Sequence, residues 1–419
     1  MCAVHCLIIG KVWPEPDSTA AGRRVLNIIQ SFQFAGYNVT FATAARQQRQ
    51  GLDLEALNVL VHFIQPNDSA FDSWIATLGP DLVLFDRFMI EEQFGWRVEK
   101  ACPMALRVLD TSDLHCLREA RRVQVESGAA FNLYNDTALR EIAAIHRSDL
   151  TFMIADYEVE LLITEFGIHE HQVAYLPFWL EADDGAEFKP FELRQDFMMI
   201  GSFLHLPNVD AIRWCKQAIW PLVRERLPQA EFHCYGAYGD GYKAELHDPD
   251  NGFIYKGRAE DALCTMQNYR VNCVPLRYGA GLKGKVFDGF QTGTPTVVTR
   301  IGAEGIVGNE EWGCGITDDP EAFAEVAVTL HTDAEAWAKV QACGRKIVRK
   351  RFGADKWLPR LPQLIDAARV NIQQNRKRNF TGRMLRHHQQ RSTEYMSRWI
   401  EAKNQNVKLL ERRTTDAES

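Results

Sequence analysis

The residues best suited to chemistry lie in a short glycine-rich stretch of the second half of the chain. Within nine residues the sequence carries three glycines and three cations: Arg277, Gly279, Gly281, Lys283, Gly284 and Lys285. Glycines allow backbone N–H groups to surround an anion, and the N-terminus of a following helix adds a positive dipole. The stretch separates an apolar run that ends at Leu276 from a helical pattern that starts near Lys285. It therefore predicts a site for a phosphorylated ligand.

Two details narrow the kind of ligand. Asp288 falls on the first turn of the predicted helix, where its carboxylate could hold the hydroxyl groups of a ribose. The run from Gly279 to Lys285 also matches G-x-x-x-x-G-K, the start of the phosphate loop of nucleotide hydrolases. Val286 follows, however, where that loop requires a Ser or Thr to hold magnesium. A nucleotide hydrolase is therefore disfavoured, and a loop whose glycines serve only turn geometry is the simpler alternative.

Polar residues after other apolar runs are candidates for acid–base chemistry. Asp110 ends the run 105–110, and His115 follows it at the start of a helical pattern. His205 has the corresponding place after the run 197–201. In a sheet of parallel strands such positions face the cleft where ligands bind. Asp110 or His115 could then act as a general base toward an acceptor hydroxyl if the reaction inverts configuration. Helix capping and surface ion pairs are the alternative roles.

These candidates must be positioned by two sets of alternating strands and helices. Seven apolar runs in the first half alternate with helical patterns, at 5–10, 38–43, 59–64, 81–86, 105–110, 150–155 and 173–177. After a polar stretch six more runs follow, at 197–201, 231–236, 253–257, 271–276, 295–299 and 313–317. Continuous apolar strands that alternate with helices are typical of parallel sheets covered on both faces.

We therefore predict an α/β protein with two tandem doubly wound, Rossmann-like domains that face a cleft. The first domain is expected at 1–180 and the second at 196–353. The polar stretch 181–195, which contains a glycine and a proline, is predicted to be the linker. Residues 354–419 are expected to form a helical extension.

Composition excludes several classes of protein and shows an uneven distribution of charge. With 46% hydrophobic and 25% charged residues, the 419-residue chain is typical of a globular protein and not of a disordered or collagen-like one. The formal net charge of −7 hides a segment, 369–413, with 12 basic and 3 acidic residues. This tail could contact an anionic membrane surface or a phosphate-rich acceptor, including RNA. A solvated helix that packs on the acidic body is the alternative.

Cysteine usage and the start of the chain bear on its location. The ten cysteines form no CxxC pair, so the ligand spacing of a zinc site is missing. No metal is expected, because no carboxylate pair resembles a DxD motif placed to hold one. Several lie in apolar runs, which favours free thiols in a reducing cytoplasm. The first apolar run, VHCLIIG, is not a signal peptide, and no run approaches the ~18 apolar residues of a membrane span. A cytoplasmic protein with peripheral membrane contact through its tail is expected.

Three segments together resemble bacterial GT-B glycosyltransferases of the family-4 type, also called glycosyl transferases group 1. They are WPEPDSTAAGRRVLNIIQSFQFAGYNVTFAT at 13–43, GSFLHLPNVDAIRW at 201–214 and GAGLKGKVFDGFQTGTPTVVTRIGAEGI at 279–306. The resemblance covers about residues 4–350, and the block 277–306 is its specific part.

The resemblance implies transfer of a sugar from a nucleoside diphosphate sugar to a hydroxyl group of a saccharide, lipid-linked or macromolecular acceptor. The second domain would hold the sugar donor and the first domain the acceptor. Lys283 and Lys285 correspond to residues that hold the donor phosphates, and Asp288 corresponds to the acidic residue that holds the ribose. The loop after the next predicted strand would line the same pocket with Gly302, Glu304 and Gly305. The reaction is expected to retain configuration and to need neither a metal nor a cofactor.

In similar enzymes, small residues in the loop after the first strand allow the sugar donor and the acceptor to approach each other. The corresponding residues are Ala20, Ala21 and Gly22. Arg23 or Arg24 could reach a phosphate from this loop. The alternative is an ordinary helix start, capped by Asp17, Ser18 or Thr19.

The chain also departs from the family. Ala280 stands where the first of two glutamates is often found, and an arginine–lysine pair after the first strand of the second domain is missing. The stereochemistry and the group that steadies the sugar therefore stay open. A nucleotide-sugar epimerase, a sugar phosphorylase and a non-catalytic nucleotide-sugar-binding scaffold are the competing interpretations. Ala280 is the best support for the scaffold.

Overall fold

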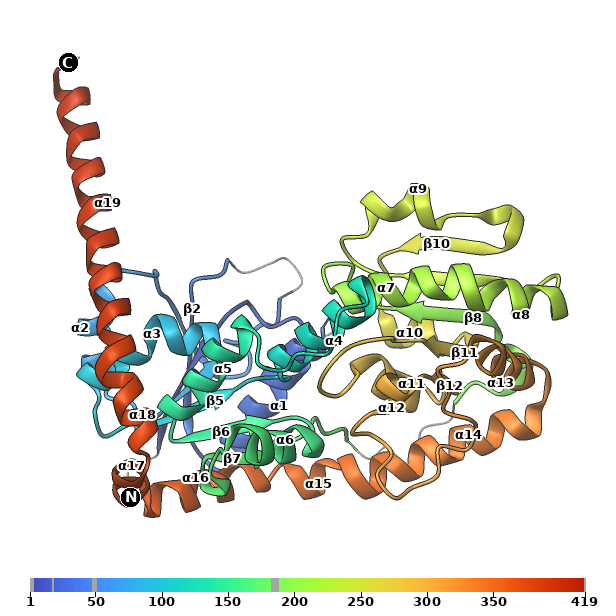
Figure 1. Cartoon of the computed structure of the whole chain (residues 1–419), viewed down its shortest axis with the longest axis horizontal. Helices are drawn as coiled ribbons and strands as arrows, with labels where there is room; N and C mark the ends of the chain where they lie inside the picture. The colour runs from blue at the N-terminus through green and yellow to red at the C-terminus, as the bar shows by residue number, and fades with distance from the viewer. Residues whose placement is uncertain (1–3, 17–18, 47–50, 182–187, 418–419) are drawn as a thin grey trace.

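The computed structural model describes residues 4–16, 19–46, 51–181 and 188–417, and it contains two parallel sheets with helices on their faces (Figure 1). The first sheet has seven strands in the order β3-β2-β1-β4-β5-β6-β7, and the second has five in the order β10-β9-β8-β11-β12. Every pair of neighbouring strands is parallel. The predicted fold class is confirmed. Residues 182–187 of the predicted linker lie outside the described residues.

The first sheet forms because its central strands are apolar on both faces and buried on both. Its strands are β1 (His5–Gly10), β2 (Asn38–Thr43), β3 (Leu60–Phe63), β4 (Leu82–Asp86), β5 (Leu106–Asp110), β6 (Leu150–Met153) and β7 (Val173–Tyr175). Its helices are α1 (Ala20–Phe34), α2 (Ala70–Leu78), α3 (Phe88–Ala101), α4 (His115–Ser127), α5 (Asp136–Arg147) and α6 (Asp156–Phe166). All five residues of β4 and all five of β5 are buried, as expected for central parallel strands.

The second sheet follows the same plan. Its strands are β8 (Gln195–Ile200), β9 (Phe232–Tyr235), β10 (Phe253–Gly257), β11 (Tyr269–Val274) and β12 (Thr296–Val298). Its helices are α7 (Leu206–Trp214), α8 (Trp220–Arg226), α9 (Lys243–Leu246), α10 (Ala262–Met266), α11 (Gly284–Thr292), α12 (Arg300–Ala303), α13 (Pro320–Thr332) and α14 (Ala334–Ile347). The predicted strand at 313–317 is wrong, because only a single bridge joins Ile316 to Val298. Gly313 has a φ of +91° and packs against Val340, which interrupts an extended run.

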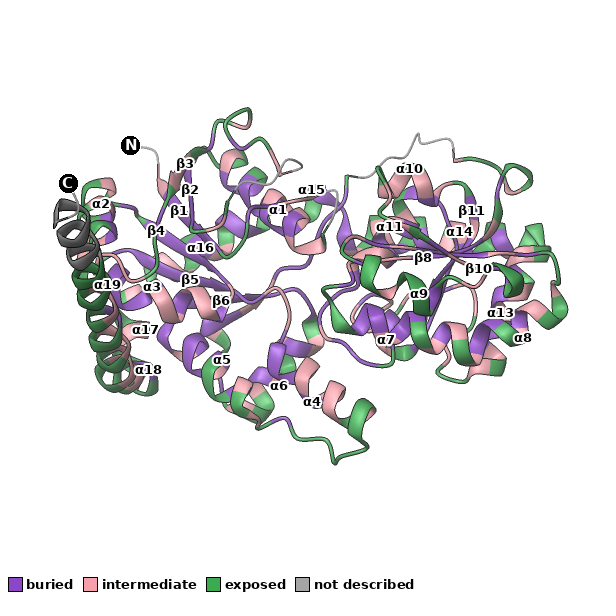
Figure 2. Cartoon of the chain, turned by 90° about the horizontal axis from the view of Figure 1, so that it is seen from above, coloured by how far each residue is buried: buried purple, intermediate pink, exposed green. Residues whose placement is uncertain are grey.

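The C-terminal extension returns to the first domain. It comprises α15 (Ala354–Trp357), α16 (Arg360–Val370), α17 (Ile372–Arg378), α18 (Phe380–Leu385) and α19 (Arg391–Ala417). Trp357, Leu361 and Ile365 are buried in the same cluster as residues of β1 and α1. Figure 1 shows these helices running beneath the first domain, with α19 passing α3 and projecting beyond it. Figure 2 shows that much of the described surface of α19 is exposed.

Two described segments that connect the domains, one leading to the second domain and one returning from it, are joined by backbone hydrogen bonds. Leu180 N donates a hydrogen bond to Phe352 O at 2.9 Å, and Ala354 N donates to Leu180 O at 2.9 Å. The outgoing and returning segments therefore lie side by side. Among the helices of the described residues, none combines the length and the apolar character needed to cross a bilayer.

Candidate functional site

The glycine-rich loop after β11 reaches across to the first domain. Gly281 N donates a hydrogen bond of 2.7 Å to Glu158 Oε1 at α6, and Arg121 Nη1 of α4 donates to Gly279 O at 2.8 Å. Glu158 is fully buried, and burial raises the pKa of its carboxyl group, whereas the hydrogen bond from Gly281 N lowers it. The loop is therefore positioned by both domains, at the carboxyl ends of their strands, where ligands bind in this type of fold.

Gly281 is required at its position for two reasons. Its φ is +61°, a conformation that side chains with a Cβ rarely adopt. A Cβ there would also lie 2.7 Å from Ile154 Cδ1 and 2.8 Å from Asp113 Cβ of the first domain. The absence of a side chain thus lets the two domains approach each other at this point.

Changing Gly281 to alanine should push the domains apart. We expect a larger radius of gyration in small-angle X-ray scattering and a loss of stability of about 1 kcal/mol or more, because alanine is strained at positive φ. Gly241→Ala is the matched control, since a Cβ at Gly241 meets nothing within 4 Å. An unchanged radius of gyration for Gly281→Ala would contradict the proposal that Gly281 allows the two domains to approach each other.

Two lysines lie at the start of α11. Lys283 is buried, its Nζ donates to Gly281 O at 2.6 Å, and it lies 3.8 Å from Glu304 Oε2. Lys285 Nζ donates to Asn208 Oδ1 of α7 at 2.7 Å. Burial lowers the pKa of both lysines, that of Lys285 to about 8. Two ammonium groups are thus held near the N-terminal dipole of one helix, an arrangement that favours an anion.

Cations of the first domain approach the same place. The pKa of His205 is lowered by desolvation and by four nearby cations; because the residue itself is exposed, the cations are the firmer cause. Those cations are Arg118, Lys285, Lys283 and Arg87. Arg87 has a φ of +74°, which is uncommon outside glycine and is found preferentially at functional sites. Positive charge from both domains therefore converges around His205, as a site for a polyanion requires.

Glu304 and Gly305 lie beside this cluster. Arg121 of the first domain forms a bidentate ion pair with Glu304, with both N–O distances at 2.7 Å. Gly305 has a φ of +76°, and a Cβ there would lie 2.9 Å from Leu282 Cδ2 of the glycine-rich loop. The structure therefore brings this loop and the glycine-rich loop together. Arg277 is held outside them by a bidentate ion pair with Asp210 of α7.

The start of α1 contacts the second domain through Arg23. Its Nη1 lies 2.7 Å from Asp288 Oδ1. Asp288 lies in the second turn of α11, one turn later than predicted. Ala21 and Gly22 belong to the first turn of α1, where Thr19 caps the helix by accepting a hydrogen bond of 3.0 Å from Gly22 N. The alternative of a capped helix start is thus confirmed for Thr19, and Arg23 also contacts the second domain.

Asp110 is held in a buried ion pair that sequence reasoning missed. Arg24 Nη2 lies 2.7 Å from Asp110 Oδ1, and both side chains are at most 2% exposed. Arg24 also donates to Pro177 O at 2.8 Å. Burial raises the pKa of Asp110, and the charge of Arg24 lowers it. A carboxylate enclosed in this way cannot meet a substrate hydroxyl, so the geometry contradicts a role as general base and indicates a positioning residue.

His115 is oriented by a second buried carboxylate. Its Nδ1 lies 2.9 Å from Glu141 Oε1 of α5. Glu141 also accepts hydrogen bonds from the backbone N–H groups of His115 at 3.1 Å and Cys116 at 2.9 Å, so it caps α4. A carboxylate that fixes an imidazole in this way can set its tautomer and its orientation. His115 therefore remains the candidate for a contact to the substrate in the first domain.

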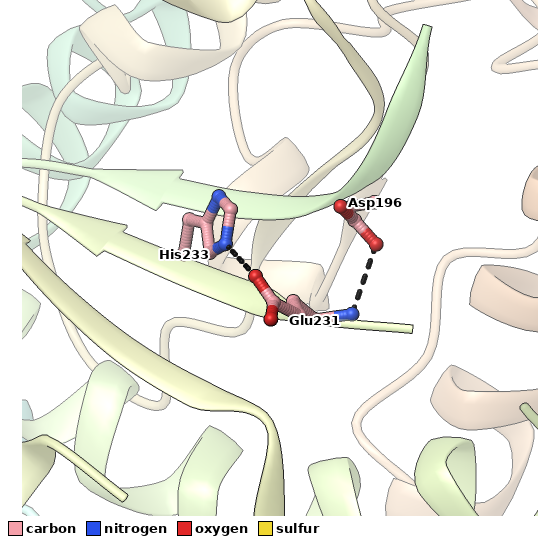
Figure 3. Close-up of side chains that lie close together, drawn as sticks. All are labelled: Asp196, Glu231 and His233. Carbon is pink, nitrogen blue, oxygen red and sulfur yellow. Dashed lines mark hydrogen bonds and ion pairs between the residues drawn. The ribbon is translucent and has the colours of Figure 1, made fainter. Parts of the chain in front are cut away.

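Asp196, Glu231 and His233 lie close enough together to share a cation (Figure 3). Their own hydrogen bonds already use most of the ligand atoms. His233 contacts Glu231 Oε2 at 2.6 Å through Nε2 and Tyr269 Oη at 2.7 Å through Nδ1, and Asp196 Oδ1 accepts from Glu231 N at 2.9 Å. The group lies at the amino ends of β8 and β9, away from the site above. We interpret it as a structural network.

Comparisons with known proteins agree with this geometry. Residues 194–333 match the family model of glycosyl transferases group 1. Similar solved structures include sucrose-phosphate synthase from Thermosynechococcus elongatus, with 15% identity, a TM-score of 0.67 and coverage of 87% of this chain and 98% of that one. HepE of Anabaena in complex with UDP-glucose has 13% identity, a TM-score of 0.62 and coverage of 87% and 98%.

A third similar structure is WaaG, a glycosyltransferase involved in lipopolysaccharide biosynthesis, with 12% identity, a TM-score of 0.59 and coverage of 87% and 99%. The chain matches no curated protein in sequence. Since all three identities are low, these structures establish the fold alone.

Proposed function

We propose that this chain, which has the GT-B fold and matches glycosyl transferases group 1 over residues 194–333, transfers a sugar from a nucleoside diphosphate sugar to a hydroxyl acceptor. One observation carries the proposal: Arg23 and Arg121 of the first domain contact the start of α11 and its glycine-rich loop, where Lys283 and Lys285 also lie. A diphosphate leaving group carries the negative charge that this arrangement can stabilise.

The second domain supplies the contacts to the sugar donor. Lys283 and Lys285 hold the diphosphate, and Asp288 holds the ribose after exchanging its ion pair with Arg23 for hydroxyl groups. Glu304 and Gly305 line the sugar side of the pocket next to the glycine-rich loop. The similarity to HepE, whose structure holds UDP-glucose, makes a uridine nucleotide the first one to test.

The proposed reaction retains configuration and uses no metal. The bond between the sugar C1 and the diphosphate oxygen breaks, the acceptor oxygen bonds to C1 from the same face, and its proton passes to the diphosphate. No enzyme base is needed in this scheme, which fits the enclosure of Asp110 by Arg24. The lysines and the helix dipole take the role that a metal would have toward the leaving group. His115, oriented by Glu141, contacts the transferred sugar or the acceptor.

We also propose a cytoplasmic location. The nine cysteines of the described residues are unpaired, and five of them are buried. Unpaired thiols in this number are typical of a reducing compartment.

Thermal-shift measurements against UDP, GDP, ADP and their sugars test the proposal. A true sugar donor should raise the free energy of unfolding with its concentration, by about 2.7 kcal/mol at a hundred times its dissociation constant. Binding without turnover would favour a scaffold, and turnover of the nucleotide sugar without an acceptor would favour an epimerase. If none of these compounds binds, the proposed function is wrong.

The pH dependence of nucleotide binding should report on Lys285. Its ammonium form binds the diphosphate, so the affinity for UDP should fall as the pH rises through about 8. The stability of the free protein has the opposite trend. Because the pKa of Lys285 in the folded protein is below the usual lysine value of 10.5, stability rises between about pH 8 and 10.5 as Lys285 loses its proton. Calorimetric titration with UDP from pH 7 to 10 checks this, with Lys285→Arg as the variant that should show a flatter profile.

A further inference from the structure

A second charged site lies between the first domain and the C-terminal extension. It is a cavity of about 700 Å³ whose lining includes the cations Arg107, Arg376, Lys377, Arg383, Arg386 and Arg391. Arg107 is near the start of β5, whereas Asp110 at the end of the same strand faces the site described above. The cavity is therefore at the opposite edge of the sheet and cannot share a ligand with the nucleotide site.

The inner part of the cavity contains three arginines that share two carboxylates. Arg107 and Arg386 each lie 3.2 Å from Glu99 Oε1, and Arg376 forms a bidentate ion pair with Asp149. These arginines are largely buried, with side-chain exposures of 6% for Arg107, 9% for Arg386 and 15% for Arg376. Three cations held beside two anions leave one positive charge uncompensated in a place of low dielectric.

The mouth of the cavity adds three exposed cations. Lys377, Arg383 and Arg391 form no ion pair with a carboxylate within the described part of the chain. Together with the inner arginines, six cations face the two carboxylates, an excess of four positive charges. Such a concentration of like charge is unfavourable by itself and is relieved by a bound polyanion. Guanidinium groups are well suited to phosphate because they present paired donors.

We propose that this cavity binds the phosphate group of an anionic ligand, either a lipid headgroup or a soluble phosphate compound. The neighbouring apolar side chains favour the lipid. Phe380 and Met384 line the cavity and are 68% and 47% exposed, and Trp399, two turns after Arg391 in α19, is 60% exposed. Cations flanked by exposed aromatic and apolar groups suit the interface of an anionic membrane. This inference does not depend on the proposed transferase activity.

The test removes the three mouth cations from the full-length protein. The cavity variant is Lys377→Gln, Arg383→Gln and Arg391→Gln. The control variant, Lys339→Gln, Arg349→Gln and Arg360→Gln, changes the net charge equally at exposed positions that do not line the cavity. Sedimentation with vesicles of phosphatidylglycerol and phosphatidylcholine, compared with phosphatidylcholine alone, measures lipid binding. Calorimetry with inorganic pyrophosphate measures binding of a soluble phosphate, and the nucleotide site contributes equally in all three proteins.

The wild type should bind the anionic vesicles, and the cavity variant should bind them roughly a hundredfold more weakly. Each cation near such a surface raises the affinity about fivefold, and the variant lacks three. The control variant should stay close to the wild type. A selective loss of pyrophosphate binding alone would assign the cavity to a soluble phosphate. Equal losses in both variants, or no binding of either probe, would overturn the proposal.

Discussion

Changing Lys285 to methionine should lower kcat/KM for transfer from the true sugar donor by roughly a hundred- to a thousandfold. Loss of one group that stabilises developing negative charge has an effect of this size in other enzymes. Lys285 is held by Asn208 at the N-terminus of α11, where its charge and the helix dipole act together. Steady-state kinetics with the donor identified by thermal shift would measure the loss.

The fall in activity should not come from unfolding. The pKa of Lys285 is lowered because its charged form is poorly solvated, so an uncharged methionine of similar length should not reduce the melting temperature. Lys339→Met, at an exposed position of α14, is the control and should leave both activity and stability unchanged. Normal turnover by Lys285→Met would remove Lys285 from the proposed mechanism.

Changing Arg24 to methionine should cost about 3–5 kcal/mol of stability, because it leaves the Asp110 carboxylate buried without its partner. Urea unfolding followed by circular dichroism would show a lower midpoint for the first domain. The double variant Arg24→Met and Asp110→Leu should recover most of the loss, since a well-packed apolar pair can replace a buried ion pair.

The matched control for this prediction is a surface ion pair. Arg122 contacts Glu119 and Glu126 on the exposed side of α4, so Arg122→Met should cost less than about 1 kcal/mol. If Arg24→Met is no more harmful than Arg122→Met, the Arg24–Asp110 pair does not stabilise the first domain as we argue.

The sequence predicts the two sheets well because most of their strands are buried on both faces. Such strands appear as short, continuous apolar runs, and the predicted run at 38–43 matches β2 residue for residue. The strand predicted at 313–317 is wrong because short runs that contain apolar residues are not always strands. The positive φ of Gly313 depends on its packing against a distant helix, which the neighbouring sequence does not indicate.

The candidate site is predictable only where its residues are neighbours in sequence. The stretch from Gly279 to Asp288 contains its own signal, in glycines and lysines at close spacing. Glu141 and Glu158, by contrast, are single acidic residues within ordinary amphipathic helices. Their importance comes from partners that are far away in the chain, such as His115 and Gly281. Composition and periodicity contain no information on such pairs, which only the fold brings together.

The paired crossing at Leu180 and Ala354 constrains how the nucleotide site can open. Two backbone hydrogen bonds join the crossing segments, so the domains cannot translate apart without breaking them. The remaining freedom is rotation about an axis through this pair, with small dihedral changes in adjacent residues. The ion pairs of Arg23 with Asp288 and of Arg121 with Glu304 then oppose this rotation, because each joins the two domains. A sugar donor that binds Asp288 would break the Arg23–Asp288 ion pair. Binding of the donor would thereby be coupled to rotation of the domains.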